Sequence, residues 1–229
     1  IIDPYTDAYR HLLQSQLVYR KFDDSEESKA AYHVGDSHCL SFAGVNFEMN
    51  RVSYKIIPLL TIGAKAYHFS TDSSSAYKSI TLRNLAEISQ GSMILVSFGE
   101  IDCRFNEGYI KAAKKRGWST NKLIELTVIK FVTWFQKAAR RFQHRLAFFN
   151  VPAPVYKNQF DKIQNQEVLN VIREHNAVLE RVLFDKKLQL LDVFSVTSEN
   201  NEYSNNFYHI DSQHLKPKTL ECINFENTF

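Results

Sequence analysis

Residues Ala31–His38 read AYHVGDSH, and this stretch decides the fold that we predict for the chain. Its first four residues form a short apolar run that predicts a buried β-strand, and Gly35 allows a tight turn at the end of that run. Ser37 follows at a position where a helix can begin. The pattern therefore predicts a serine hydroxyl at the end of a buried strand.

Further strands and helices follow this stretch along the chain. Apolar runs that end near turn residues predict four more strands, at Ile56–Ile62, Met93–Phe98, Leu146–Phe149 and Leu188–Phe194. Helical periodicity predicts helices between them, over about Tyr77–Ser89, Lys122–Phe142 and Glu167–Phe184. Alternating strands and helices predict a five-stranded parallel sheet with helices on both faces, which is a three-layer α/β/α fold. Ligands in such sheets bind at the carboxyl ends of the strands, where Ser37 is expected.

Composition limits the class of protein. The chain has 229 residues, of which 44% are hydrophobic and 13% aromatic, enough for one sizeable core. Its 28 Lys and Arg residues against 25 Asp and Glu residues leave a net charge of +3. A dedicated nucleic-acid binder carries a larger basic excess, so no nucleic-acid partner is predicted. The apolar stretches are too short to cross a bilayer, so we expect a soluble protein without a membrane span.

The beginning of the chain predicts an added segment before the main domain. A helical pattern over about Tyr5–Tyr19 leads to the acidic run Asp23–Glu27, so residues 1–30 are expected to form a helical extension and residues 31–229 the main domain. The chain begins without an initiator Met or a secretory apolar core. We therefore expect a trimmed domain or a processed product, which allows a longer multidomain parent.

The three cysteines are Cys39, Cys103 and Cys222. Their odd number and lack of metal-site spacing predict neither a disulfide framework nor a metal site, and they mildly favour a reducing, cytoplasmic compartment. Neither Cys39 nor Cys103 has the flanking base that would mark a nucleophile, so both are expected to be small buried residues.

A second motif, Asp211-Ser212-Gln213-His214, lies near the other end of the chain. Residues three apart on one turn lie side by side, so the Asp211 carboxylate can orient the His214 ring and leave its second nitrogen for Ser37. A serine hydroxyl needs such a base, which typically contributes about 10²–10⁴-fold in rate. Each motif alone is more often an ordinary capped turn than a functional site. Their joint placement at the two ends of the predicted fold favours the catalytic interpretation.

These motifs resemble those of the SGNH/GDSL hydrolase family, which carries a GDS motif at its start and a D-x-x-H motif at its end. Weaker similarities are Phe98–Asp102 to the third sequence block of that family, Asn150–Pro154 to its proline-rich strand exit and His175–Leu179 to its late helix. The resemblance covers nearly the whole chain after about residue 30. It implies a flavodoxin-like fold and an acyl-enzyme mechanism with Ser37 as nucleophile, His214 as base and Asp211 as its partner. The mechanism that the resemblance implies requires no metal and no organic cofactor.

One departure from the family pattern concerns the oxyanion hole. The family has an asparagine just before the aspartate of its third block, whereas this chain has Ile101 there. Isoleucine donates no side-chain hydrogen bond, and removal of one oxyanion donor costs about 10²–10³-fold in rate. The remaining candidate donors are the backbone N–H groups of Ser37 and Gly63, the glycine after the second predicted strand.

Charged residues crowd the same block, at Glu100, Asp102 and Arg104. Asp102 or Arg104 can contact a polar substrate, or the charges can brace the loop as an ion-paired turn. We expect Asp102 and Arg104 to pair with each other or with close neighbours. The basic run Lys111–Arg116 is expected to be a solvated face, with binding of an acidic polymer as the alternative.

Three functions remain open on the sequence alone. The first is hydrolysis of a carboxylic ester, with a small acyl group such as acetyl removed from a carbohydrate or another polar substrate. The second is O-acetyl transfer to a glycan, in which a sugar hydroxyl replaces water and the same residues serve. The third is a binding domain of a larger protein, catalytically weak because Ile101 replaces the oxyanion donor.

Overall fold

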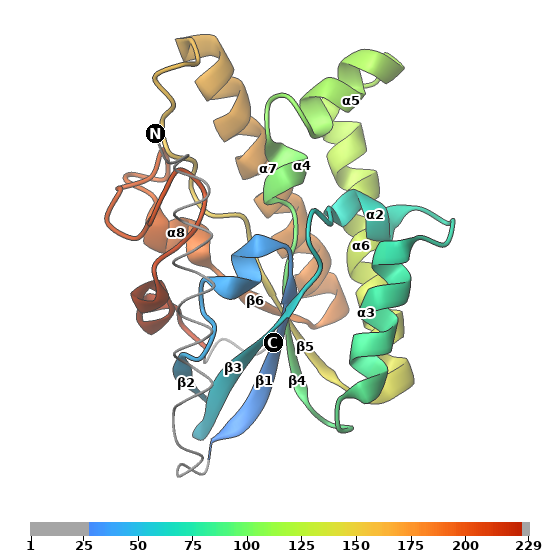
Figure 1. The fold of residues 1–229 in the computed structure, drawn as a ribbon. Coiled ribbons are helices and arrows are strands. Elements are labelled where there is room, and N and C mark those ends of the chain that lie inside the picture. Colours follow the sequence, from blue (N-terminus) through green and yellow to red (C-terminus); the bar gives the residue numbers. More distant parts are fainter. Residues whose placement is uncertain (1–27, 226–229) are drawn as a thin grey trace, which may run out of the picture.

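The computed structural model describes residues 28–225, so the helix predicted over Tyr5–Tyr19 lies outside the described residues. The strands are β1 (Lys29–Gly35), β2 (Asn46–Met49), β3 (Val52–Leu60), β4 (Met93–Ser97), β5 (Arg145–Phe149) and β6 (Gln189–Leu191). The helices are η1 (Ser37–Leu40), α2 (Ala66–Ser70), α3 (Ala76–Glu87), α4 (Glu100–Cys103), α5 (Tyr109–Arg116), α6 (Thr120–Phe142), α7 (Lys162–Lys186), α8 (Val193–Thr197) and η2 (Pro217–Cys222). Figure 1 shows how these elements are arranged.

The strands form one sheet in the order β2-β3-β1-β4-β5-β6. Five of them, from β3 to β6, are parallel, and their order is that of a flavodoxin-like fold. The predicted count of five strands is wrong by one, because β2 pairs antiparallel with β3 at the edge. A two-residue turn, Asn50-Arg51, joins the two strands with φ angles of 52° and 61°, the conformation typical of a tight hairpin. Since β2 has only four residues, its alternating pattern is too short to predict a strand.

The two faces of the sheet have separate apolar cores. Ile94 and Val96 of β4 pack on the side of the long helices α6 and α7, whereas Met93 and Leu95 pack on the other side. That second side is covered by residues of the C-terminal segment, including Leu215 and the η2 region. Figure 1 accordingly shows α3 and α6 on one side of the sheet and α8 on the other. The predicted three-layer α/β/α fold is confirmed.

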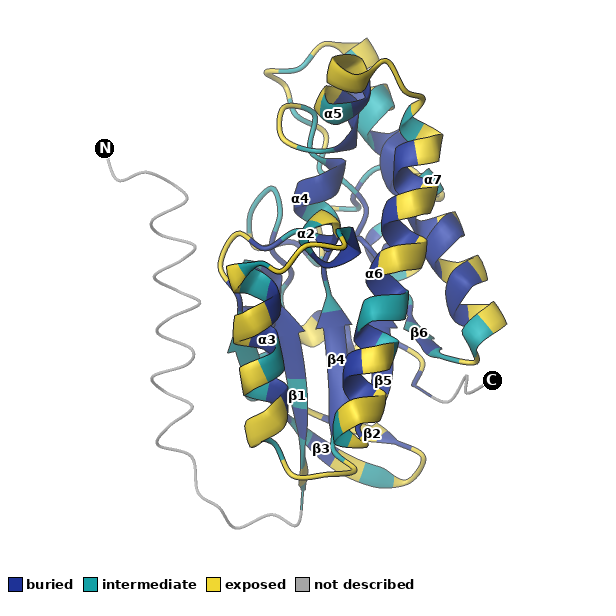
Figure 2. Cartoon of the chain, turned by 90° about the vertical axis from the view of Figure 1, so that its right-hand side faces the viewer, coloured by how far each residue is buried: buried dark blue, intermediate teal, exposed yellow. Residues whose placement is uncertain are grey.

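Burial follows the helical periodicity that the sequence predicts. Figure 2 shows α6 and α7 with buried residues turned toward the sheet and exposed residues turned away from it. Ser119 and Asp161 begin these two helices by accepting the backbone N–H groups of Lys122 and Gln164 with their side chains. None of the helices within residues 28–225 combines the length and the apolar character needed to span a bilayer.

The strand predicted over Leu188–Phe194 is wrong in its second half. β6 ends at Leu191, and Asp192 begins α8 by accepting the backbone N–H of Ser195 at 3.1 Å. Short apolar runs do not by themselves distinguish a strand from a buried helix, and here the capping aspartate decides.

Candidate active site

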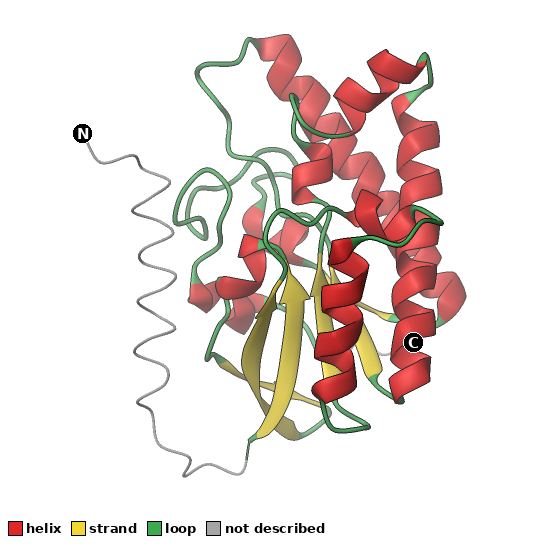
Figure 3. Ribbon diagram, turned by 45° about the vertical axis from the view of Figure 1, so that its right-hand side comes forward, coloured by secondary structure: helices red, strands yellow, loops and turns green. Residues whose placement is uncertain are grey.

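The candidate nucleophile turn, Gly35 and Asp36 before Ser37, joins β1 to η1 at the carboxyl edge of the sheet, where the loops of Figure 3 gather above the strands. Gly35 is required there, because a Cβ atom at this position would lie 2.5 Å from the Ser97 hydroxyl oxygen and 3.0 Å from the Cys39 side chain. Asp36 caps η1 and accepts the backbone N–H of His38 at 2.9 Å. Ser37 is therefore the first residue of a short, rigidly capped helix, and its side chain is partly exposed.

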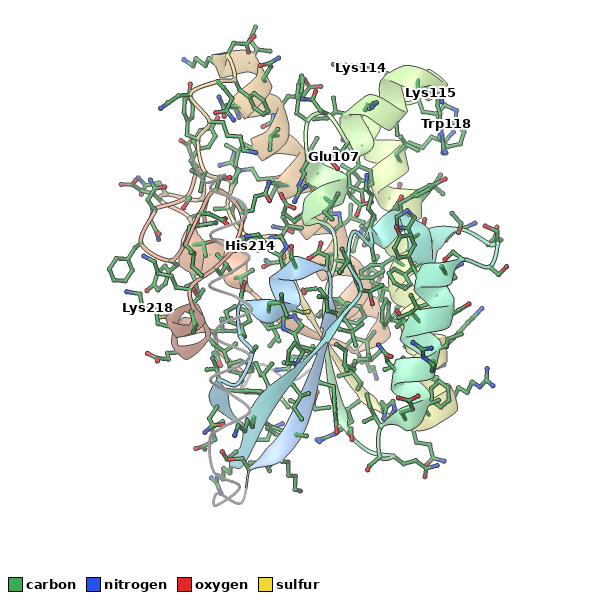
Figure 4. The ribbon with its side chains drawn as sticks, viewed as in Figure 1. Glu107, Lys114, Lys115, Trp118, His214 and Lys218 are labelled. Atoms are coloured by element: carbon green, nitrogen blue, oxygen red, sulfur yellow. The ribbon has the colours of Figure 1, made fainter. Side chains whose placement is uncertain are left out.

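The structure brings the two sequence motifs together. His214 Nε2 lies 2.9 Å from Ser37 Oγ, and His214 Nδ1 lies 2.7 Å from Asp211 Oδ2. Asp211 Oδ1 also accepts the backbone N–H groups of Gln213 and His214, each at 2.7 Å. Figure 4 shows His214 beside the η1 segment, above the ends of the strands. This is the arrangement predicted for a nucleophile, a base and an orienting carboxylate.

Proton positions follow from the partners of the His214 ring. Burial alone would raise the pKa of Asp211, but the hydrogen bonds from His214 outweigh it and lower the pKa to about 2. The carboxylate is therefore ionised at neutral pH and accepts from Nδ1–H. In the neutral ring with this Nδ1–H, Nε2 carries the lone pair and can accept a hydrogen bond from the Ser37 hydroxyl. The buried His214 ring is held in the tautomer that a general base requires.

The third sequence block forms α4 and the turn before it. Gly99 has a φ of 132°, and a Cβ atom there would lie 2.6 Å from His175 Nε2. Ile101 is buried, so it packs in the core and adds no donor to the site. The oxyanion donor that the family pattern supplies from this position is thus missing from the α4 side chains.

Asp102 bonds the start of α2. Its carboxylate accepts the backbone N–H groups of Ala66 at 2.7 Å and Tyr67 at 3.1 Å, so it caps the start of α2. Burial raises the pKa of Asp102 to about 7, against the lowering effect of these two hydrogen bonds. Among the ion pairs of the described residues, none joins Asp102 to Arg104. This geometry favours bracing of α2 over substrate contact.

Arg104 pairs with close neighbours and not with Asp102, which is one of the two arrangements expected from the sequence. Its guanidinium lies 2.8 Å from Glu100 Oε2 and 3.2 Å from Glu107 Oε1, and it donates to Gln213 Oε1 at 2.9 Å. Gln213 directly precedes His214. Arg104 therefore ties α4 to the loop that carries the base, and its donors are largely occupied by protein groups.

Gly63 lies in the exposed loop after β3 with a φ of 69°. This loop is attached to the nucleophile turn, because Thr61 N–H donates to the Gly35 carbonyl at 2.8 Å. No hydrogen bond joins Gly63 to the catalytic residues in the described part of the chain. Its service as an oxyanion donor stays a prediction.

Other candidates of the sequence lie outside the site or are inert. Burial raises the pKa of the Cys39 and Cys103 thiols well above the usual range, so neither is an activated nucleophile. The basic run Lys111–Arg116 lies on α5, and Figure 4 shows Lys114 and Lys115 at the outer end of this helix, away from His214.

Two residues of the site were not singled out from the sequence. His38 bonds Asp36 Oδ1 through Nδ1 at 2.8 Å and the Gln213 carbonyl through Nε2 at 3.1 Å. Gln213 consequently connects to both His38 and Arg104. A usable signal existed, since His38 adjoins Ser37 and Gln213 adjoins His214 in the two motifs.

A cleft adjoins the loop of the base. Polar side chains line part of it, including Arg104, Lys157 and Gln213, and apolar residues line the rest, including Phe105, Phe160, Pro152, Pro154, Val168 and Ile172. The Phe105 and Phe160 rings have centroids 5.6 Å apart, and Lys157 Nζ lies 5.5 Å from the centre of the Phe160 ring. The cleft thus combines hydrogen-bonding groups with aromatic faces. Within residues 28–225 no group of three or more His, Cys, Asp or Glu side chains could hold a metal ion.

Comparison with known proteins supports the fold. No protein-family model matches the chain, and no curated protein matches it. A GDSL-like lipase from Bacteroides thetaiotaomicron matches in structure with a TM-score of 0.53 and 11% identity, over 92% of this chain and 91% of that chain. An extracellular lipase from Streptomyces rimosus matches with a TM-score of 0.51 and 11% identity, over 83% of this chain and 94% of that chain. The chain has the fold of the GDSL-like hydrolases.

Proposed function

We propose that this chain is a serine ester hydrolase of the SGNH/GDSL type. The observation that carries the proposal is the continuous hydrogen-bonded series from Ser37 Oγ through the His214 ring to Asp211, with distances of 2.9 Å and 2.7 Å. Nucleophile, base and orienting acid come from opposite ends of the chain, and the base has a free lone pair toward the nucleophile. If the two motifs were only capped turns, nothing would require Ser37 and His214 to lie within hydrogen-bond distance.

The chemistry follows from these positions. Ser37 Oγ attacks the ester carbonyl carbon while its proton passes to His214 Nε2, and Asp211 stabilises the imidazolium that forms. The C–O bond to the alcohol then breaks, and His214 returns the proton to the departing alcohol oxygen. Water, deprotonated by His214, hydrolyses the acyl-enzyme and restores the Ser37 hydroxyl.

The oxyanion is held in this proposal by backbone N–H groups. Among the described residues, the Ser37 N–H has no protein acceptor, since it begins η1 and lies outside the turn bonds of that helix. Gly63 is the second candidate, from the loop attached to Gly35. With the buried Ile101 in place of a side-chain donor, we expect a slower enzyme by about 10²–10³-fold than one with a complete set.

For the substrate we propose a small acyl group, such as acetyl, on a carbohydrate or another polar molecule. The cleft beside the base presents the Lys157 ammonium and the Gln213 amide nitrogen, which can bond hydroxyl groups, together with the Phe105 and Phe160 rings. The size of this cleft and its mixture of polar and apolar lining suit a small acyl group on a polar molecule.

A binding domain with little catalysis is the competing function, and the replacement of the oxyanion asparagine by Ile101 favours it. Turnover of a short-chain aryl ester by the wild type and by Ser37→Ala separates the two. The account predicts measurable wild-type hydrolysis and a loss of about 10³-fold or more in the variant. Because Ser37 is partly exposed and adds little packing, Ser37→Ala should retain the wild-type Tm. Equal rates of hydrolysis in the wild type and Ser37→Ala would mean that Ser37 is not the nucleophile.

A further inference from the structure

The His38 side chain is buried between two oxygen atoms that only accept hydrogen bonds. Its Nδ1 lies 2.8 Å from Asp36 Oδ1, and its Nε2 lies 3.1 Å from the Gln213 carbonyl oxygen. A neutral imidazole has one N–H group and therefore satisfies only one of these acceptors. Both nitrogens must carry hydrogen for both contacts to be bonds. The partners thus define His38 as an imidazolium that faces an ionised Asp36.

Burial of this charge is compensated on site. Asp36 is 2% exposed and His38 is 8% exposed. Burial lowers the pKa of His38, but the charge and hydrogen bond of Asp36 outweigh it and raise the pKa to about 9. The attraction is mutual, because the same contacts hold the pKa of Asp36 below its usual value despite its burial. At pH 7 the two residues form a buried ion pair.

The titratable and charged groups that face His38 come from several elements. They are Asp36, Glu100, Arg104, His33, His209 and His214. Glu100 favours the charged form of His38, and Arg104 opposes it. Burial lowers the pKa of His33 to about 3 and that of His209 to about 4, so both are neutral at pH 7.

The position of the ion pair in the chain gives it a mechanical consequence. Asp36 and His38 flank the nucleophile Ser37, and Gln213 directly precedes the base His214. The bond from His38 to the Gln213 carbonyl therefore joins the residue after the nucleophile to the residue before the base. The His38 and His214 rings lie close, with centroids 5.1 Å apart. Arg104 donates a hydrogen bond to the side-chain oxygen of the same Gln213 at 2.9 Å.

We propose that Asp36 and His38 form a second acid–imidazole pair, distinct from Asp211 and His214, which positions the base against the nucleophile through the Gln213 carbonyl. This proposal rests on the proposed esterase function. His38 is a positioning residue and not an alternative base, since neither of its nitrogens has a free lone pair. Without the tie, the Gln213–His214 segment is attached to the nucleophile turn mainly through the 2.9 Å catalytic contact itself.

Loss of the His38 proton should open this tie. The pKa of His38 is raised from 6.5 to about 9, so its contribution to stability is fully present below pH 6.5, and the charge itself is lost as the pH rises through about 9. After deprotonation, one ring nitrogen carries a lone pair and faces an acceptor oxygen, either of Asp36 or of Gln213, so that contact is no longer a hydrogen bond. An alkaline decline of kcat with an apparent pKa near 9 is therefore expected in the wild type.

The test compares His38→Gln with the wild type, with His68→Gln as the matched control. His68 lies on α2, outside the catalytic residues, and its Nδ1 accepts one backbone N–H, a bond that glutamine can replace. We expect kcat of His38→Gln to fall about 10- to 100-fold with KM little changed, because misplacement of a catalytic group by 1 Å can cost about 10²-fold. The decline near pH 9 should disappear in this variant and persist in the control. A wild-type kcat with an unchanged alkaline decline would overturn the proposal.

Nitrogen NMR of the histidine rings keeps the test independent of how well the variant folds. In the wild type both His38 nitrogens should be protonated at pH 7.5 and one should lose its proton near pH 9. A neutral His38 tautomer at pH 7.5 would overturn the proposal. Failure of the esterase function is distinguished by the wild type itself: no ester turnover overturns both proposals, whereas normal turnover in His38→Gln overturns only the positioning role.

Discussion

The substitution Asp211→Asn changes one atom of the site and tests the role of the carboxylate. The asparagine Oδ1 can still accept the backbone N–H groups that Asp211 accepts at 2.7 Å each, so the loop should keep its shape. The amide nitrogen, however, replaces the oxygen that lies 2.7 Å from His214 Nδ1. Because an amide NH₂ only donates, Nδ1 must become the acceptor, and the ring proton moves to Nε2.

A proton on Nε2 removes the lone pair that the Ser37 hydroxyl requires. The same tautomer reversal in a serine–histidine–aspartate site costs about 10⁴-fold in kcat, which corresponds to about 5.5 kcal/mol of transition-state stabilisation. Steady-state hydrolysis of a short-chain aryl ester measures the loss. Asp161→Asn is the matched control, since Asp161 caps α7 with its carboxylate and asparagine caps a helix equally well. A decrease below about 10-fold in kcat for Asp211→Asn would refute the assigned tautomer.

Two further predictions concern α4 and the turn before it. Arg104→Ala should lower kcat about 10-fold while KM changes little, because the guanidinium bonds Glu100 and Gln213 and so holds the loop of the base. Steady-state kinetics on the same ester measure both constants. A higher KM with unchanged kcat would instead mean that Arg104 binds substrate. Gly99→Ala should lower the free energy of unfolding by about 2–4 kcal/mol in urea titrations, because a Cβ atom would meet His175 Nε2 at 2.6 Å at a φ of 132°; a change below about 0.5 kcal/mol would contradict the close approach.

The fold is largely readable from the sequence where periodicity is long or burial is continuous. The central strand predicted at Met93–Phe98 is observed at Met93–Ser97, and the helix predicted at Lys122–Phe142 is observed at Thr120–Phe142. Short elements were missed because their patterns carry little information. β2 has four residues, and α2 has five, with its start capped by Asp102 of the distant helix α4. Such a tertiary cap leaves no local signal.

Some residues of the site could likewise be placed from the sequence and others could not. Ser37, Asp211 and His214 could be placed together from two motifs and the rule that strand ends share one edge. The partners of the charged residues could not be predicted. Asp102 and Arg104 are two residues apart in sequence, yet Asp102 bonds α2 and Arg104 bonds Gln213. The protonation of His38 likewise depends on a carbonyl 175 residues away.

The central claim, that Ser37 is an activated nucleophile, is tested most directly by labelling the folded wild type with a serine-directed fluorophosphonate and mapping the modified peptide. The hydrogen bond to His214 at 2.9 Å predicts stoichiometric modification of Ser37 alone, and no modification in Ser37→Ala or in denatured protein. Ser37 that stays unlabelled in the folded wild type, or a label on another residue, would contradict the account.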